Sequence, residues 1–367
     1  MTAAPTLTSS DYQYLAVLAK YGRRRLRDAC SKLCGASDSA DVGSLEQSLD
    51  GEQRQRLLSS FAADQLPWQT LAAQMQSHGI SVLIGADLPR WLRYMPDPPM
   101  ALYVRGQPQL LQQPAIAVVG ARRASQRGLN WAHRVAQGLA DSGLMVVSGM
   151  ALGVDAAAHR GALDADGPTT AVLGSGLLRP SPASNEALMR RILDSGGAVV
   201  SEYPLTLNAS KYTFPERNRI ITGLALGLLV VEAGPRSGTL ISARMALEQG
   251  REVMAVPGPV GSPVSIGCHR LIKQGAALVE TVEDVLEALD WQPLSSAASA
   301  PAHSSARRLP QSPAAASLLA HIDGTVTTVD ALIAASKCSA EKVSATLTLL
   351  ELDGFVQRVA QGYIRSP

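Results

Sequence analysis

From Ala115 onward the chain alternates short apolar runs with amphipathic segments of helical length, and this alternation restricts the fold more than any other feature. Runs such as AIAVVG, LMVVSG and TTAVLG are apolar throughout, without the apolar–polar alternation of a half-exposed strand. Segments such as GLNWAHRVAQGLADSG follow them, with apolar residues at helical spacing. Strands buried on both faces and joined by helices form parallel sheets, so the sequence predicts an α/β fold with a doubly wound, mostly parallel sheet.

Changes in composition divide the 367 residues into four segments. Residues 8–70 contain short helical patterns separated by glycines such as Gly22, and predict a small helical domain. Residues 75–290 hold a proline-broken lead-in and the strand–helix units. Residues 291–312 are rich in Ser, Ala and Pro and predict a flexible linker. Residues 313–367 predict three helices and a short hairpin, which is the winged-helix pattern.

The charge balance and the cysteine content exclude several classes of protein. Lys and Arg total 33 against 31 Asp and Glu, and a net charge of +2 excludes a polybasic binder but not a local basic pocket. The first residues lack a secretory pattern, and the apolar run at 220–231 is too short to span a bilayer, so we expect a cytoplasmic protein without a membrane partner. Four scattered cysteines, without a zinc-ligand pattern, predict no metal site.

Most strands of the predicted sheet end in a turn of small residues. In a doubly wound sheet the carboxyl ends of the strands border the ligand crevice. Short side chains let backbone N–H groups and helix N-termini face an anion, so these turns predict phosphate binding. The candidate residues are Gly120, Ser148, Gly149, Gly174, Gly176, Ser237, Gly238 and Thr239.

The first of these turns does not fit a nucleotide cofactor. Arg122 and Arg123 stand where a dinucleotide-binding turn needs glycines, and the next strand ends in Ser148 instead of an acidic residue that would hold a ribose. The GxxxxGK[ST] pattern of a P-loop does not occur. We therefore expect no cofactor.

Candidates for catalysis are few. His159 follows Asp155 by one helical turn, so the two form either a base with its orienting carboxylate or a local cap beside a packed histidine. Glu202 and Glu232 end strands, where carboxylates often hold phosphate-binding arginines in place. No Ser-His-Asp arrangement is recognisable.

Several motifs together resemble one family. GARRASQRG, SGMALGVDAAAHRGAL, KYTFPERNRIITGLA, VVEAGPRSGTLISARMALEQG and SIGCHRLIKQGA are similar, in this order, to motifs of the bacterial DNA-processing protein A (DprA/Smf) family. The resemblance covers about residues 115–279. It implies an extended Rossmann-like fold and a non-enzymatic homodimer that binds single-stranded DNA, protects incoming strands during natural transformation, and helps to load RecA recombinase. The N-terminal helices resemble a sterile-alpha-motif-like (SAM-like) domain.

Matching the family's motifs to this chain assigns the candidate DNA contacts. The arginine of the family's G-S-R turn falls on Arg122, and the basic residue before F-P-x-R-N-R falls on Lys211. We expect these two to contact DNA directly and Phe214 or Tyr212 to stack a base, which is worth roughly 1–3 kcal/mol. The F-P-x-R-N-R motif itself falls on Phe214, Pro215, Arg217, Asn218 and Arg219.

The two arginines of that motif have two possible roles. Either both neutralise phosphates, or one of them pairs with Glu202 or Glu232, and we expect Arg219 to be that structural clamp. Leu152 replaces an arginine that the family often has, which removes one possible phosphate contact. Leu178 and Ser181 likewise replace an aspartate and a tyrosine of the family.

Three alternatives remain open on the sequence alone. A nucleotide phosphoribohydrolase has a related turn, but Ser242 stands where its catalytic glutamate belongs. The basic stretch YGRRRLR is either a DNA-facing patch or a solvated helix face. Residues 312–367 carry four Lys or Arg against five Asp or Glu, which favours a protein contact or an auxiliary DNA role over operator reading.

Overall fold

Nine strands form one sheet within the part of the chain that the computed structural model describes, which is residues 7–34, 51–291, 313–322, 327–336, 338–352, 355–359 and 362–365. The order across the sheet is β1-β2-β6-β5-β4-β3-β7-β8-β9. β2 runs antiparallel to β1 and β6, and every other neighbouring pair is parallel. The strands are β1 (Ile80–Leu83), β2 (Leu102–Gly106), β3 (Ala115–Val119), β4 (Met145–Ser148), β5 (Thr169–Val172), β6 (Ala198–Ser201), β7 (Gly227–Val230), β8 (Glu252–Ala255) and β9 (Ala277–Leu278).

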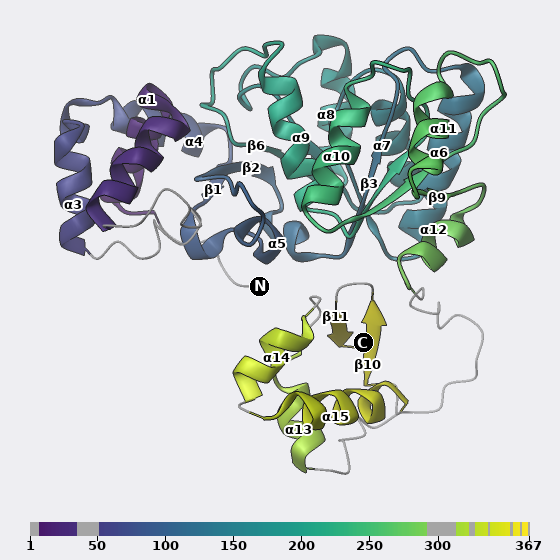
Figure 1. Cartoon of the computed structure of the whole chain (residues 1–367). Coiled ribbons are helices and arrows are strands. Elements are labelled where there is room, and N and C mark those ends of the chain that lie inside the picture. The colour runs from purple at the N-terminus through teal and green to yellow at the C-terminus, as the bar shows by residue number, and fades with distance from the viewer. Residues whose placement is uncertain are drawn as a thin grey trace.

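Helices cover both faces of the sheet (Figure 1), which confirms the doubly wound, mostly parallel prediction. Successive residues of β3 point to opposite faces, and both sets are buried, so Ile116 packs in one hydrophobic cluster and Ala117 in the other. One face carries α6 (Gln126–Asp141), α7 (Val154–Asp164), α8 (Glu186–Asp194) and α12 (Val282–Ala288). The other face carries α5 (Arg90–Arg93), α9 (Thr213–Gly223), α10 (Thr239–Glu248) and α11 (Ile266–Lys273). Short 3₁₀ turns are η1 (Ala63–Gln65), η2 (Gly85–Asp87), η3 (Pro108–Gln112) and η4 (Ala183–Asn185).

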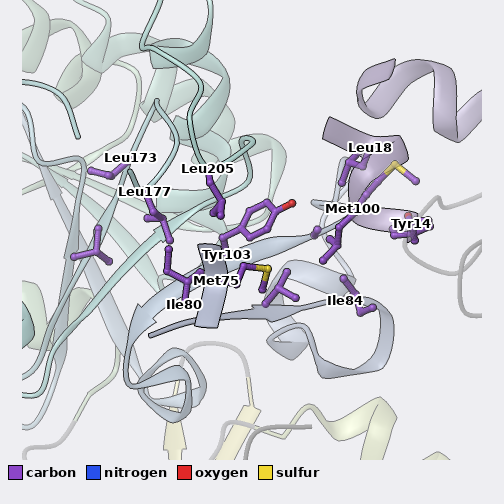
Figure 2. Close-up of a cluster of buried hydrophobic side chains, with 14 of the residues drawn as sticks. Tyr14, Leu18, Met75, Ile80, Ile84, Met100, Tyr103, Leu173, Leu177 and Leu205 are labelled. Atoms are coloured by element: carbon purple, nitrogen blue, oxygen red, sulfur yellow. The ribbon is translucent and has the colours of Figure 1, made fainter. Parts of the chain in front are cut away.

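The N-terminal helices pack directly against the end of the sheet that contains β1 and β2. They are α1 (Ser9–Cys34), α3 (Gly51–Ser60) and α4 (Trp68–Ser77), and α1 consists of two helices that meet at Gly22, where φ is 80°. Figure 2 shows Tyr14 and Leu18 in the same buried cluster as Tyr103 of β2 and Leu205 beyond β6. The expected boundary near residue 70 therefore lies inside one continuous hydrophobic core.

The C-terminal segment has a hydrophobic core of its own. Leu318, Leu332 and Leu347, one from each of three helices, are buried together. The elements are α13 (Pro313–Leu319), α14 (Val329–Ser336), α15 (Ala340–Leu352), β10 (Val356–Val359) and β11 (Gly362–Arg365), and β10 pairs antiparallel with β11. Three helices and a hairpin confirm the winged-helix prediction.

Trp291, the first residue of the expected linker, is buried and donates from its indole nitrogen to the Ser142 carbonyl at 3.1 Å, so it belongs to the sheet domain. Residues 292–312 lie outside the described residues. Of the helices that are described, none has the length and apolar character needed to cross a bilayer.

Candidate nucleic-acid interface

A crevice of about 310 Å³ opens at the carboxyl edge of the sheet. β3 pairs with β4 on one side and β7 on the other, so the connections leaving β3 and β7 diverge there, which is where doubly wound sheets bind ligands. The lining residues come from the turn after β3, the start of α7, the start of α9, and the turn that opens α10: Val119, Gly120, Ala121, Arg122, Ala151, Asp155, Phe214, Pro215, Arg217, Asn218, Ile221, Ser237, Gly238, Thr239 and Ser242.

On one side of the crevice, the backbone at the start of α7 packs closely against the turn after β3. Gly153 adopts a φ of 81°, and a Cβ there would lie well inside contact distance of the Ala121 carbonyl oxygen. The Val154 N–H donates to that same oxygen at 3.3 Å. A Cβ on Gly120 would lie 2.6 Å from Cγ2 of Val154. Gly120 thus allows the close approach of α7 to β3, and it also lines the crevice.

Two exposed cations lie beside aromatic rings at this edge. The Arg122 guanidinium stands 4.8 Å from the centre of the Phe214 ring, and Lys211 lies 5.0 Å from that of Tyr212. Tyr212 is 72% exposed, whereas Phe214 is only partly exposed and has Arg122 over one face. Of the two aromatic residues expected to stack a base, Tyr212 therefore presents the freer face.

Arg217 is buried and ties two strands together. Its side chain is oriented by carbonyl oxygens, because Nη1 donates to Gly149 and Val172 at the ends of β4 and β5. Burial lowers its pKa to about 10, while the charge of Asp155 opposes that shift. A Cβ on Gly149 would collide with the guanidinium, so a side chain at this position would have to displace Arg217 from these carbonyls. The structure thus places Arg217 in the buried floor of the crevice rather than at its exposed rim.

Arg219 is buried in an ion-pair cluster. Its Nη2 pairs with the Glu202 carboxylate, its Nε lies 3.3 Å from Oδ2 of Asp97, and its Nη1 donates to the Asp97 carbonyl at 2.9 Å. Glu232 has a different partner, since it accepts from the Ser125 N–H at 2.9 Å and the Ser125 hydroxyl at 2.6 Å. Arg219 is therefore positioned as a clamp between the lead-in segment and the end of β6.

The other expected anion-binding residues divide into two groups. Ser148, Gly174 and Gly176 are buried and do not line the crevice; Ser148 donates to the Val118 carbonyl at 2.6 Å, and a Cβ on Gly176 would overlap the backbone at Pro204. Ser237, Gly238 and Thr239 do line it, at the N-terminus of α10, where the helix dipole favours an anion.

The structure separates the two residues of the expected Asp155–His159 pair. His159 Nδ1 lies 2.7 Å from the Thr169 hydroxyl, which itself donates to the Val146 carbonyl, so Nδ1 carries the hydrogen. Burial lowers the pKa of His159 to about 3. Asp155 instead accepts from the Ala151 N–H at 3.3 Å, and burial raises its pKa while the charge of Arg217 lowers it. These contacts match the local cap and packed histidine, not a base with its orienting carboxylate.

Sequence reasoning missed two features of the site. Asp97, a partner of Arg219, lies in the proline-broken lead-in, where no periodicity marks it. Asp155 interacts electrostatically with Arg217, which lies 62 positions later in the sequence. The only sequence signal for a buried carboxylate was the position of Asp155 in the first turn of a predicted helix. The described residues contain no cluster of His, Cys, Asp or Glu that could hold a metal ion.

Fold and crevice together define a Rossmann-like protein with a crevice at the switch point of its sheet, lined by Arg122 and by the N-terminus of α10. Comparison with known families specifies the class further. Residues 80–290 match the sequence model of the DNA recombination-mediator protein A family, and residues 296–362 match that of the DprA winged helix domain. The chain belongs to the DNA recombination-mediator protein A family.

Individual relatives agree with this assignment. The chain is 43% identical over 292 residues to Protein Smf of Escherichia coli, covering 77% of each chain. It is 44% identical over 195 residues to the DNA processing protein DprA of Streptococcus pneumoniae, covering 53% of this chain and 68% of that one.

Two solved structures are similar as well. The X-ray structure of the Streptococcus pneumoniae protein matches with a TM-score of 0.60 at 33% identity, covering 77% of this chain and 98% of that one. DNA processing protein A of Helicobacter pylori, described for its single-stranded DNA binding mode, matches with a TM-score of 0.52 at 28% identity, covering 57% and 94%.

Proposed function

We propose that this protein binds single-stranded DNA across the crevice, with little dependence on base sequence. The observation that carries the proposal is the pair of exposed cations, Arg122 and Lys211, each beside an aromatic ring at the carboxyl edge of the sheet. Cations that track the backbone and rings that stack bases are the two components of sequence-tolerant single-strand binding. The Helicobacter pylori relative, described for its single-stranded DNA binding, supports the same ligand.

Salt dependence tests this proposal. Each phosphate contact removed should lower the slope of log affinity against log salt concentration by about 0.7 on a single strand. We expect Arg122→Ala and Lys211→Ala each to weaken binding to oligo-dT and to reduce the slope by about that amount. Arg244→Ala, which removes an exposed arginine 3.5 Å from Glu248 on α10, is the matched control and should leave the slope unchanged. Unchanged slopes in both crevice variants would reject the proposal.

We further propose that the crevice binds and does not catalyse. Asp155 is the one carboxylate among its lining residues, and it is buried beside Arg217 in the floor. Ser242 lines the crevice at the position where a phosphoribohydrolase would need glutamate. Incubation with nucleoside monophosphates should release no free base, and detectable base release would favour the enzyme.

The wider role that we propose follows the family. The protein would act in the cytoplasm as a homodimer, protect incoming single strands during natural transformation, and help RecA recombinase to assemble on them. Nuclease protection of oligo-dT and the rate of RecA filament formation on the bound strand would measure these two activities. Both should decrease in Arg122→Ala, and RecA filament formation that is independent of this protein would contradict the loading role.

A further inference from the structure

A second basic surface lies outside the crevice, along the two helices that cover one face of the sheet. α6 and α7 lie side by side (Figure 1), and their backbones are close enough that a Cβ on Gly161 would overlap the His133 carbonyl. Their outer surfaces enclose an open groove of about 830 Å³. Its lining residues are Gln126, Arg127, Leu129, Asn130, His133, Arg134, Ala157 and Arg160.

The groove has an uncompensated positive charge. Arg127, Arg134 and Arg160 are exposed, and none of them forms an ion pair with a carboxylate of the described residues. The acidic residue at the far end, Asp164, is already held by His133 at 2.8 Å and Arg191 at 3.1 Å. Three unpaired guanidinium groups in one groove raise the local concentration of anions.

The groove begins where the crevice ends. Arg122 lines the crevice, and Gln126 and Arg127 of the groove follow it four and five positions later, after the turn that leads from β3 into α6. From Arg127 to Arg134 the helix rises about 10 Å. That length is enough for the groove to contact more than one phosphate of a single strand.

We propose that the groove between α6 and α7 binds the backbone phosphates of the same single strand as it leaves the crevice, which lengthens the binding site beyond the crevice. This inference rests on the proposed single-strand binding. Arg127, Arg134 and Arg160 supply the charge, and the strand passes over the turn at Arg122 and Arg123.

A ladder of oligo-dT lengths tests the groove. The variant is Arg134→Gln with Arg160→Gln, and the control is Arg56→Gln with Arg244→Gln, which removes two exposed arginines that already pair with Glu52 and Glu248. In the groove variant, affinity should stop rising at a shorter oligonucleotide length than in the wild type. On the long oligonucleotides the salt slope should fall by about 1.4, and affinity at 0.1 M salt by roughly 25-fold. On the shortest binding oligonucleotide both double variants should match the wild type.

The groove and the crevice can fail separately. If the groove variant behaves as the control does at every length, or weakens short and long oligonucleotides equally, the groove is not a continuation of the strand path and the proposal is overturned. The groove would then fit an acidic protein surface instead. Arg122→Ala is measured in parallel and should weaken binding at every length. If it has no effect, the proposed crevice function fails, whatever the groove variant does.

Discussion

The arginines around the crevice are of two kinds, exposed and buried. Arg122 is exposed beside an aromatic ring, whereas Arg217 and Arg219 are buried and hold backbone carbonyls and carboxylates. A buried guanidinium is stable only when its donors are satisfied, because the transfer of a charge from water is costly. Both guanidinium groups donate to oxygen atoms of the protein itself, so we infer a structural role for these two arginines and propose the DNA contact for Arg122.

Removal of the Arg219 clamp should therefore affect folding and not the ion dependence of DNA binding. In Arg219→Met the Glu202 carboxylate, 6% exposed, loses its cation, and the free energy of unfolding should fall by about 3–5 kcal/mol. The exposed pair gives the control, since Arg244→Met should cost less than about 1 kcal/mol. Chemical denaturation measures both. A loss of the same small size in the two variants would show that the clamp contributes little.

His159 should make stability depend on pH. Because burial lowers its pKa to about 3, the folded protein keeps the imidazole neutral while the unfolded chain binds a proton below about pH 6.5. Stability due to this group is therefore lost as the pH falls from 6.5 toward 3. Between pH 6.5 and pH 5 the wild type should lose about 2 kcal/mol more unfolding free energy than His159→Asn. Parallel pH profiles of the two proteins would contradict this prediction.

At the scale of elements, the start of α7 and the turn after β3 form one unit. The Val154 N–H donates to the Ala121 carbonyl, and Gly153 keeps the two segments close through its positive φ. The sequence predicted a glycine turn at this place, but it assigned the glycine N–H groups to an anion. The structure adds a packing reason for glycine there, because a Cβ on Gly120 would lie 2.6 Å from Cγ2 of Val154.

Gly153→Ala should separate these elements. The new Cβ would combine a backbone conformation that costs of order 1–3 kcal/mol with a collision against Ala121, so we expect at least about 2 kcal/mol of destabilisation. Oligo-dT affinity should fall as well, because the turn carries Arg122. Gly51→Ala, with open space around its Cβ and no positive φ, is the control and should be nearly neutral. Unchanged melting in Gly153→Ala would mean that the turn accommodates the methyl group.

At the scale of the whole molecule, the hydrophobic clusters show which parts depend on one another. Tyr14 and Leu18 of α1 share a cluster with Tyr103 of the sheet, while Leu332 and Leu347 belong to a separate cluster in the C-terminal segment. Burial of one large apolar side chain contributes about 1.5–3 kcal/mol to the free energy of unfolding. Exposure of the shared cluster should therefore destabilise the protein strongly.

Truncation from the two ends should therefore give opposite results. Removal of residues 292–367 should leave thermal unfolding of the remaining chain and its oligo-dT salt slope nearly unchanged, because the deleted segment has its own core and its six Lys or Arg are almost balanced by five Asp or Glu. Removal of residues 1–78 should lower the melting temperature strongly, since Tyr103 and Ile80 lose buried neighbours. Calorimetry distinguishes the two, and equal stability of both truncated chains would contradict the shared core.

The sequence by itself determined the sheet, the winged-helix pattern and the edge at which a ligand would bind. Each of these follows from local periodicity and from the rule that parallel strands end at one edge. Tertiary structure decided which of the predicted residues face solvent. Arg122, Arg217 and Arg219 are equally basic in the sequence, and only the positions of Glu202, Asp97 and the ends of β4 and β5 separate an exposed cation from two buried ones. Burial depends on neighbours from distant parts of the chain, and no local pattern records them.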